Sequence, residues 1–128
     1  SSKEKCDICL GQGPTWAWPI EAKAVRALRN NGSLEPNQIK QLLSPYAEDG
    51  SAVTDATKVL SFSATSNRAV LLWAFDYPQH PVEPLLDMYE YILGKRVNVL
   101  ERAEAVFEGL VHPHHKRGSV LAWSVAQL

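Results

Sequence analysis

The apolar run from Ala69 to Phe75 constrains the fold of this chain more than any other feature. It places seven apolar residues in a row, and a segment that is apolar on all sides is typical of an element covered by protein everywhere. Ser66 or Asn67 is a suitable helix N-cap, and Pro78 ends the segment. We therefore interpret 66–77 as a buried central helix, although a buried strand would also explain the run.

Helical spacing of apolar residues precedes this run. Pro19 fits the first position of a helix over 19–30, and Gly32 follows its end. A short second helix ends at Ser44-Pro45, because the residue before a proline avoids the helical region. A third helix is expected to begin near Thr54 or Asp55.

The pattern that follows the run is more regular. Apolar residues recur at helical spacing from Pro81 to Leu93, and Gly94 stands just past the predicted helix end. The same spacing resumes over 99–111 and predicts a second amphipathic helix. For 119–128 a helix is favoured over a strand, and both remain open.

These patterns together predict an all-α fold. We expect a compact single-domain bundle of about six or seven short-to-moderate helices around the buried central helix at 66–77. Residues 1–18 carry Gly11, Gly13 and Pro14 without a sustained period, so they are expected to form an irregular N-terminal arm. The helical domain would then comprise 19–128.

Composition indicates one ordinary globular domain. The 128 residues include 45% hydrophobic and 21% charged residues, and the formal net charge is -1, so no long-range attraction to nucleic acid or to an anionic membrane is expected. No apolar run is long enough to span a bilayer, and the first residues lack the apolar core of a secretory signal. Two cysteines are too few for a disulfide framework. We expect an intracellular protein, cytoplasmic or nuclear, with no membrane partner.

The cysteine pair Cys6 and Cys9 forms a C-x-x-C motif, which supplies two of the four ligands of a structural zinc site. The clustered histidines His112 and His114 are the candidate partners, because Pro113 between them keeps that segment extended. The expected cofactor is therefore none, or one structural zinc ion. Free thiols beside surface histidines, or a redox dithiol, remain alternatives to the zinc site.

Candidate partner-binding residues lie at the margins of the predicted bundle. Trp16 and Trp18 are aromatic residues in the arm that either hold it against the body or remain available to a partner. His80 lies in a proline-flanked loop, and Lys116 and Arg117 extend the histidine cluster into a short basic patch. That patch makes phosphate or RNA binding conceivable, but a solvated loop is the simpler interpretation.

No catalytic signature is present. The chain has no G-x-S-x-G, P-loop, H-E-x-x-H or dinucleotide-binding fingerprint. The acidic row of Glu83, Asp87 and Glu90 is interpreted as the solvent face of the 81–93 helix. Enzymatic activity is therefore uncertain, and the sequence leans against it.

One short resemblance supports a helical assembly module. The order of Gly13-Pro14-Thr15-Trp16, Pro19-Ile20-Glu21, Thr54-Asp55 and Leu72-Trp73 resembles the first half of the N-terminal capsid domain of alpha- and betaretroviral Gag proteins. The resemblance implies a helical fold that assembles with copies of itself or with a partner, and it assigns no functional residue.

The sequence therefore predicts a non-enzymatic helical module for protein interaction or self-assembly, of a viral or regulatory protein. A protein partner or a second copy is the expected ligand. The alternative is a zinc-stabilised nucleic-acid-binding domain that uses the C-x-x-C arm and the histidine-rich basic loop.

Overall fold

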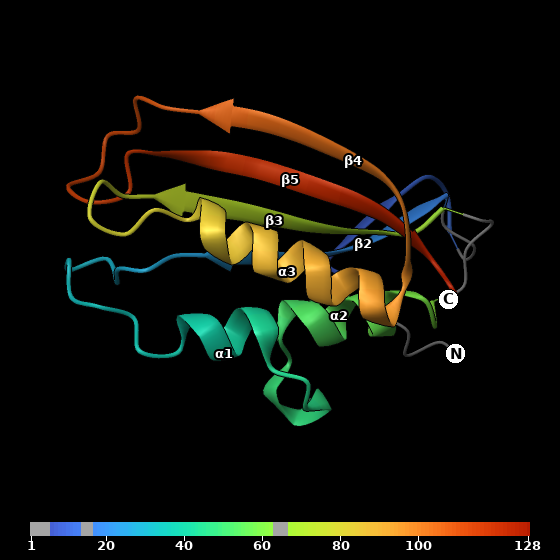
Figure 1. Cartoon of the computed structure of the whole chain (residues 1–128). Coiled ribbons are helices and arrows are strands. Elements are labelled where there is room, and N and C mark those ends of the chain that lie inside the picture. The colour runs from blue at the N-terminus through green and yellow to red at the C-terminus, as the bar shows by residue number, and fades with distance from the viewer. Residues whose placement is uncertain (1–5, 14–16, 63–66) are drawn as a thin grey trace.

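The protein is built on a five-stranded mixed β-sheet with three α-helices on one side of it (Figure 1). The computed structural model describes residues 6–13, 17–62 and 67–128. The predicted all-α bundle is therefore wrong, and so is the helical fold that the capsid resemblance implied.

The strand order across the sheet is β1-β2-β3-β5-β4. Strands β2 and β3 are parallel and are joined through α1 and α2, whereas the other neighbouring pairs are antiparallel. The elements in chain order are β1 (Ile8–Leu10), β2 (Trp18–Val25), α1 (Gln38–Leu43), the short 3-10 helix η1 (Ala47–Asp49), α2 (Ala52–Val59), β3 (Ala69–Asp76), α3 (Glu83–Arg96), β4 (Asn98–Phe107) and β5 (Arg117–Ala126).

The apolar run is a strand rather than the predicted central helix. As β3 it is the middle strand of the sheet, paired with β2 on one side and with β5 on the other. Val70, Leu72 and Ala74 point toward the helices and are buried, and the chain supplies strand partners that the sequence pattern did not reveal. An unbroken apolar run is therefore explained by a central strand.

Three further predicted helices are also strands or loops. Segment 19–30 begins as β2, segment 99–111 lies mostly in β4, and segment 119–128 lies in β5. In β4 the alternation of charged and apolar residues belongs to an edge strand whose two faces are largely exposed. Charged residues on an edge strand discourage pairing with foreign strands.

The helices α1, α2 and α3 agree with sequence predictions, although their ends differ. The N-cap of α2 is Ser51, whose hydroxyl accepts a hydrogen bond from the Thr54 N–H at 3.2 Å. Helix α3 continues to Arg96, so Gly94 lies inside it rather than past its end. None of the described helices has both the length and the apolar character needed to cross a lipid bilayer.

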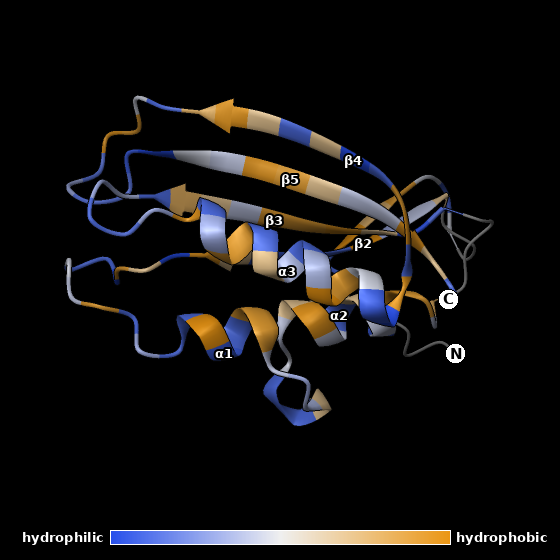
Figure 2. Cartoon of the chain, viewed as in Figure 1, coloured by the Kyte–Doolittle hydropathy of each residue, from blue (hydrophilic) through white to orange (hydrophobic). Residues whose placement is uncertain are grey.

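The hydrophobic core lies between the helices and one face of the sheet. Trp123 of β5 is fully buried against Tyr89 of α3, with their ring centroids 5.2 Å apart. The Trp123 indole N–H donates to Glu90 at 2.8 Å, and the Tyr89 hydroxyl donates to the Ala52 carbonyl at 3.1 Å. Figure 2 shows that hydrophobic residues also run along β2, β3 and β5, and the described helices all lie on one face of these strands.

Candidate functional site

The first part of the candidate site is a pair of carboxylates on the β1–β2 hairpin. Ile8 is opposite Ile20 in antiparallel register, so Asp7, just before β1, faces Glu21 of β2. The two side chains share a hydrogen bond. The Asp7 carboxylate also accepts a hydrogen bond from the Ala22 N–H at 2.9 Å, which fixes its position beside β2.

Glu21 is buried and carries the most perturbed carboxyl group of the site. Only 3% of the residue is exposed, because α2 covers this face of β2. Burial and the neighbouring Asp7 raise the pKa of Glu21 to about 7, while its hydrogen bond holds the pKa of Asp7 below the usual value. Two carboxyl groups this close do not readily ionise together, so near neutral pH they share a proton.

Two lysines flank the carboxyl pair. Lys23 lies two residues after Glu21 on the same face of β2, since alternate residues of a strand point to the same side. Its ammonium group lies 3.6 Å from the Asp55 carboxylate and donates to the Gly50 carbonyl. From α2, the Lys58 ammonium lies 3.1 Å from Glu21 Oε1, although that oxygen has no well-aligned hydrogen-bond donor among the described residues.

Helix α2 completes the site with two further charged residues. Asp55 and Lys58 lie three residues apart and face the same side of the helix. Burial raises the pKa of Asp55, and the contact with the Glu21 carboxyl group raises the pKa of Lys58. Because 55% of the Lys58 side chain is exposed, this lysine has room to move away from Glu21.

We call Asp7, Glu21, Lys23, Asp55 and Lys58 the carboxylate–lysine cluster. Two adjacent carboxylates are suitable ligands for Mg²⁺, which is usually held by one or two carboxylates together with water and substrate phosphate. A group of three or more His, Cys, Asp or Glu side chains in a metal-binding arrangement does not occur among the described residues. The donor set therefore fits an oxygen-ligated, partly hydrated cation better than a closed zinc site.

Cys6 and Cys9 are bonded to each other in a disulfide. Asp7 lies between them in the sequence, and Cys9 pairs with Pro19 at the start of β2. The disulfide therefore encloses the residue that contacts Glu21.

The histidine-rich loop lies beyond the other end of β2. The His114 ring packs against the backbone of Gly32, and the His112 ring stacks on His115 with centroids 4.5 Å apart. The predicted zinc ligands Cys6, Cys9, His112 and His114 are therefore separated along the sheet: the cysteines are beside the first residues of β2 and the histidines beside the loop after it.

His115 is the centre of a hydrogen-bonded network in that loop. The Asn30 amide oxygen accepts from Arg26 and lies 3.0 Å from His115 Nε2, so this ring nitrogen donates to it. The Tyr77 hydroxyl then donates to His115 Nδ1 at 2.7 Å. Burial, followed by the nearby His112 and the Arg26 charge, lowers the pKa of His115. Both ring nitrogens are occupied, which is the arrangement of a structural histidine.

The predicted partner-binding residues are dispersed. Trp16 lies outside the described residues, and Trp18 lies in β2 on the uncovered face of the sheet. His80 lies in the turn after β3, where its N–H donates to the Tyr77 carbonyl at 3.1 Å. Lys116 is exposed, and Arg117 lies 3.8 Å from Asp76.

Sequence reasoning missed the carboxylate–lysine cluster. The signal was Glu21-Ala22-Lys23, in which a carboxylate and an ammonium group two residues apart share a face of a strand. Because 19–30 was interpreted as a helix, residues two apart were expected to point in different directions. Asp7 gives no signal of its own in the sequence, because it lies inside the C-x-x-C motif.

Comparisons of this chain with protein-family models, with curated proteins and with solved structures found no match.

Proposed function

We propose that this protein is a divalent-cation-dependent hydrolase of nucleic-acid phosphodiester bonds, with Asp7, Glu21 and Lys23 as its catalytic residues. The observation that carries the proposal is the antiparallel register that sets Asp7 opposite Glu21 on the hairpin, with Lys23 on the same face of β2. This proposal replaces the sequence-based preference for a non-enzymatic module.

The carboxyl pair supports binding of a divalent cation. Two carboxyl groups that must share one proton form a site in which a doubly charged cation can take the place of that proton. Mg²⁺ or Mn²⁺ bound there would supply an activated water and neutralise the charge of a phosphate oxygen. Lys58 lies 3.1 Å from Glu21 and occupies this position as a monovalent substitute, which its exposed side chain can leave.

Lys23 supports phosphoryl chemistry rather than simple cation storage. A phosphodiester gains negative charge on its oxygens as the transition state forms, and a fixed ammonium group stabilises that charge. The contacts of Lys23 with Asp55 and Gly50 hold its ammonium group on the side of β2 that carries Glu21. Asp55 is therefore a positioning residue for Lys23.

An open approach supports a polymeric substrate. Asp7 is exposed, and the cluster lies toward the β1 edge of the sheet. Pockets of about 310, 580 and 640 Å³ are lined by other residues. A reactive group at an open edge suits an extended polyanion better than a small ester that must be enclosed.

The experiment is a cleavage assay of the purified chain on single-stranded and double-stranded DNA and RNA, with Mg²⁺, Mn²⁺ or EDTA. We expect cation-dependent cleavage that falls about 100-fold or more in each of Asp7→Asn, Glu21→Gln and Lys23→Met. Binding of Mn²⁺ alone, measured by electron paramagnetic resonance, should weaken in Asp7→Asn and Glu21→Gln and persist in Lys23→Met.

Matched controls are Glu48→Gln and Lys40→Met, because Glu48 is exposed on η1 and Lys40 lies on α1, both outside the carboxylate–lysine cluster. Both should cleave like the unmodified chain. If no nucleic acid is cleaved with either cation, or if Glu21→Gln cleaves as well as Glu48→Gln, the proposal is wrong.

A further inference from the structure

The second face of the sheet is an apolar surface that none of the described helices covers (Figure 1). All three helices lie on the face to which Glu21, Lys23 and the core residues of β3 and β5 point (Figure 1). Alternate residues must therefore point to the other side. Along β2, β3 and β5 these outward residues include no charged side chain. The larger ones are Trp18, Ile20, Leu71, Trp73, Phe75 and Val120.

Trp73 projects from the middle of this surface, which we call the open face. It is 38% exposed, although its neighbours in the register are only Ala24 on β2 and Val120 on β5. A tryptophan exposed between smaller side chains on a sheet is a strong candidate for an interface anchor.

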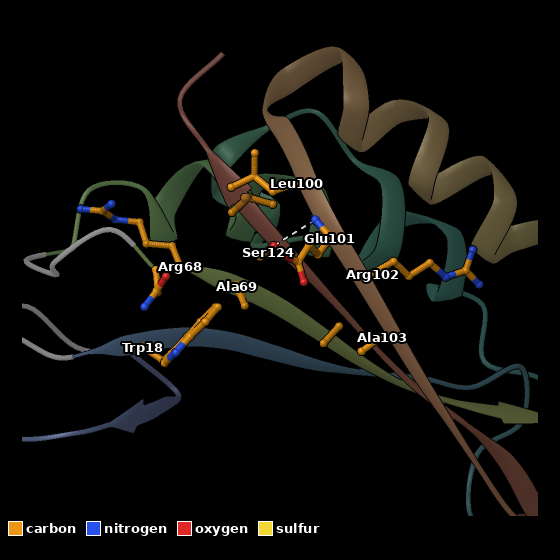
Figure 3. Close-up of a pocket in the computed structure, with 11 residues that line it drawn as sticks. Trp18, Arg68, Ala69, Leu100, Glu101, Arg102, Ala103 and Ser124 are labelled. Atoms are coloured by element: carbon orange, nitrogen blue, oxygen red, sulfur yellow. Dashed lines mark hydrogen bonds between the residues drawn. The ribbon is translucent and has the colours of Figure 1, made fainter.

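A hollow lies on the same face, toward the beginning of β3. Its volume is about 310 Å³, with Ala69, Ala103, Ala122 and Ser124 among the lining residues. Figure 3 shows Trp18 on one side of these small residues and Glu101 with Leu100 on the other. The open face therefore carries both a projecting ring and a recess.

We propose that the open face binds a second copy of this chain, so that Trp73 of each copy enters the hollow of the other. Ala69 and Trp73 are four residues apart on β3, which is about 13 Å. In this dimer the two sheets face each other across a two-fold axis. The axis lies between the sheets, crosses the strands and passes over Leu71. It therefore places each Trp73 over the partner copy's hollow. Leu71 then meets its own copy at the axis, as an isologous interface requires.

The size and charge of the open face fit a second copy. Four strands about 4.8 Å apart and about seven residues long cover on the order of 450 Å² on each copy, or roughly 900 Å² in total, which is the size of a weak, transient interface. Facing sheets of this kind pack closely in β-sandwiches. The outward residues of β2, β3 and β5 carry no charge and so give no repulsion between identical faces, while Arg68, Glu101 and Arg102 bring both signs of charge to the hollow. The expected dimer is therefore weak and purely apolar at its centre.

The experiment is analytical ultracentrifugation of the full chain at concentrations from about 1 to 300 µM. This range covers the weak dimer dissociation constants that a small interface is expected to give. Trp73→Lys should raise the dimer dissociation constant about 30-fold or more, as loss of an interface anchor does. Tyr91→Lys is the matched control, because Tyr91 is a 68%-exposed aromatic on α3, on the covered side of the sheet. It should dimerise like the unmodified chain.

A charge-pairing experiment distinguishes loss of the dimer contact from a folding defect of the variant. Leu71→Lys and Leu71→Glu should each be monomeric alone and should form a heterodimer when mixed, because the two positions meet at the axis. The proposal is overturned if the unmodified chain stays monomeric at about 300 µM, a concentration at which even a weak dimer is populated. It is equally overturned if Trp73→Lys dimerises normally. It is also overturned if Val106→Lys, on the β4 edge, abolishes the dimer by itself. Binding of single-stranded RNA at Trp73, in place of a second copy, would overturn it as well.

Discussion

Glu21 places a carboxyl group in a buried position between β2 and α2, where an ionised carboxylate is unfavourable. The residue is 3% exposed under α2, and both burial and Asp7 raise its pKa. Such a group is costly to keep in a folded protein, since each unit of pKa shift corresponds to about 1.4 kcal/mol. Perturbed carboxyl groups of this kind concentrate at functional sites, which is the physical reason for assigning Glu21 a chemical role.

We predict that Glu21 makes the stability of the protein fall as the pH rises toward neutrality in the absence of divalent cations. In the folded chain Glu21 keeps its proton up to a pKa of about 7, whereas in the unfolded chain it releases the proton near 4.5. Stability is therefore fully present below pH 4.5 and is lost as the pH rises to about 7. The expected loss is on the order of 2 kcal/mol.

Urea denaturation in EDTA at about pH 5 and about pH 8, roughly two units below and one unit above the Glu21 pKa of about 7, measures this effect. The Glu21→Gln chain has no proton to lose, so the part of the pH dependence due to residue 21 should vanish in it. Glu48→Gln should keep the dependence of the unmodified chain. Parallel pH profiles for Glu21→Gln and the unmodified chain would contradict the assigned proton.

At the level of elements, the sequence pattern located α1, α2 and α3 but wrongly assigned four strands as further helices. Helix α3 was recognised because Leu86, Tyr89 and Leu93 recur at helical spacing on its buried face. Strand β3 was misassigned because an apolar run carries no period, so only its pairing with β2 and β5 distinguishes a strand from a helix. That pairing is non-local and is not visible in one sequence.

The missed strands also explain the missed site. A carboxylate–lysine cluster requires β1 and β2 to be paired, so that Asp7 faces Glu21 across fourteen residues of sequence. The C-x-x-C motif was visible, but its role was not, because metal binding and disulfide formation begin from the same two residues. The open face could not be predicted from the sequence either. The alternation of residues along β2 and β3 identifies an exposed face only when it is known that the helices cover the other one.

Two glycines test how tightly the elements pack. A Cβ atom on Gly118 of β5 would lie 2.0 Å from the Ala74 carbonyl oxygen and 2.7 Å from the Phe107 ring, so Gly118→Ala should lower the free energy of unfolding by about 2 to 3 kcal/mol.

Gly94 inside α3 has open space around it, so Gly94→Ala should raise the free energy of unfolding by about 0.5 to 1 kcal/mol.

Chemical denaturation of both glycine variants beside the unmodified chain provides the measurement. The two substitutions add the same methyl group and differ only in their surroundings, so each is the control for the other. A neutral Gly118→Ala would mean that β3 and β5 are not held at the close separation described above.

For the whole molecule, the sheet divides the two proposed surfaces. Glu21 and Lys23 point toward α2, whereas Trp73 projects from the opposite face. A substitution on one face should leave the other intact, because the two share no side-chain partner and energies of separate sites add.

This separation predicts the outcome of combining the two proposals in one set of variants. Trp73→Lys should be monomeric while its Mn²⁺ affinity stays within about two-fold of the unmodified chain. Glu21→Gln should lose Mn²⁺ binding and dimerise with an unchanged dissociation constant. Resonance titration of Mn²⁺ and sedimentation of the same samples measure both properties. If Trp73→Lys lost the cation as well as the dimer, the two surfaces would be coupled through β2 and β3, and the sheet would transmit rather than separate their states.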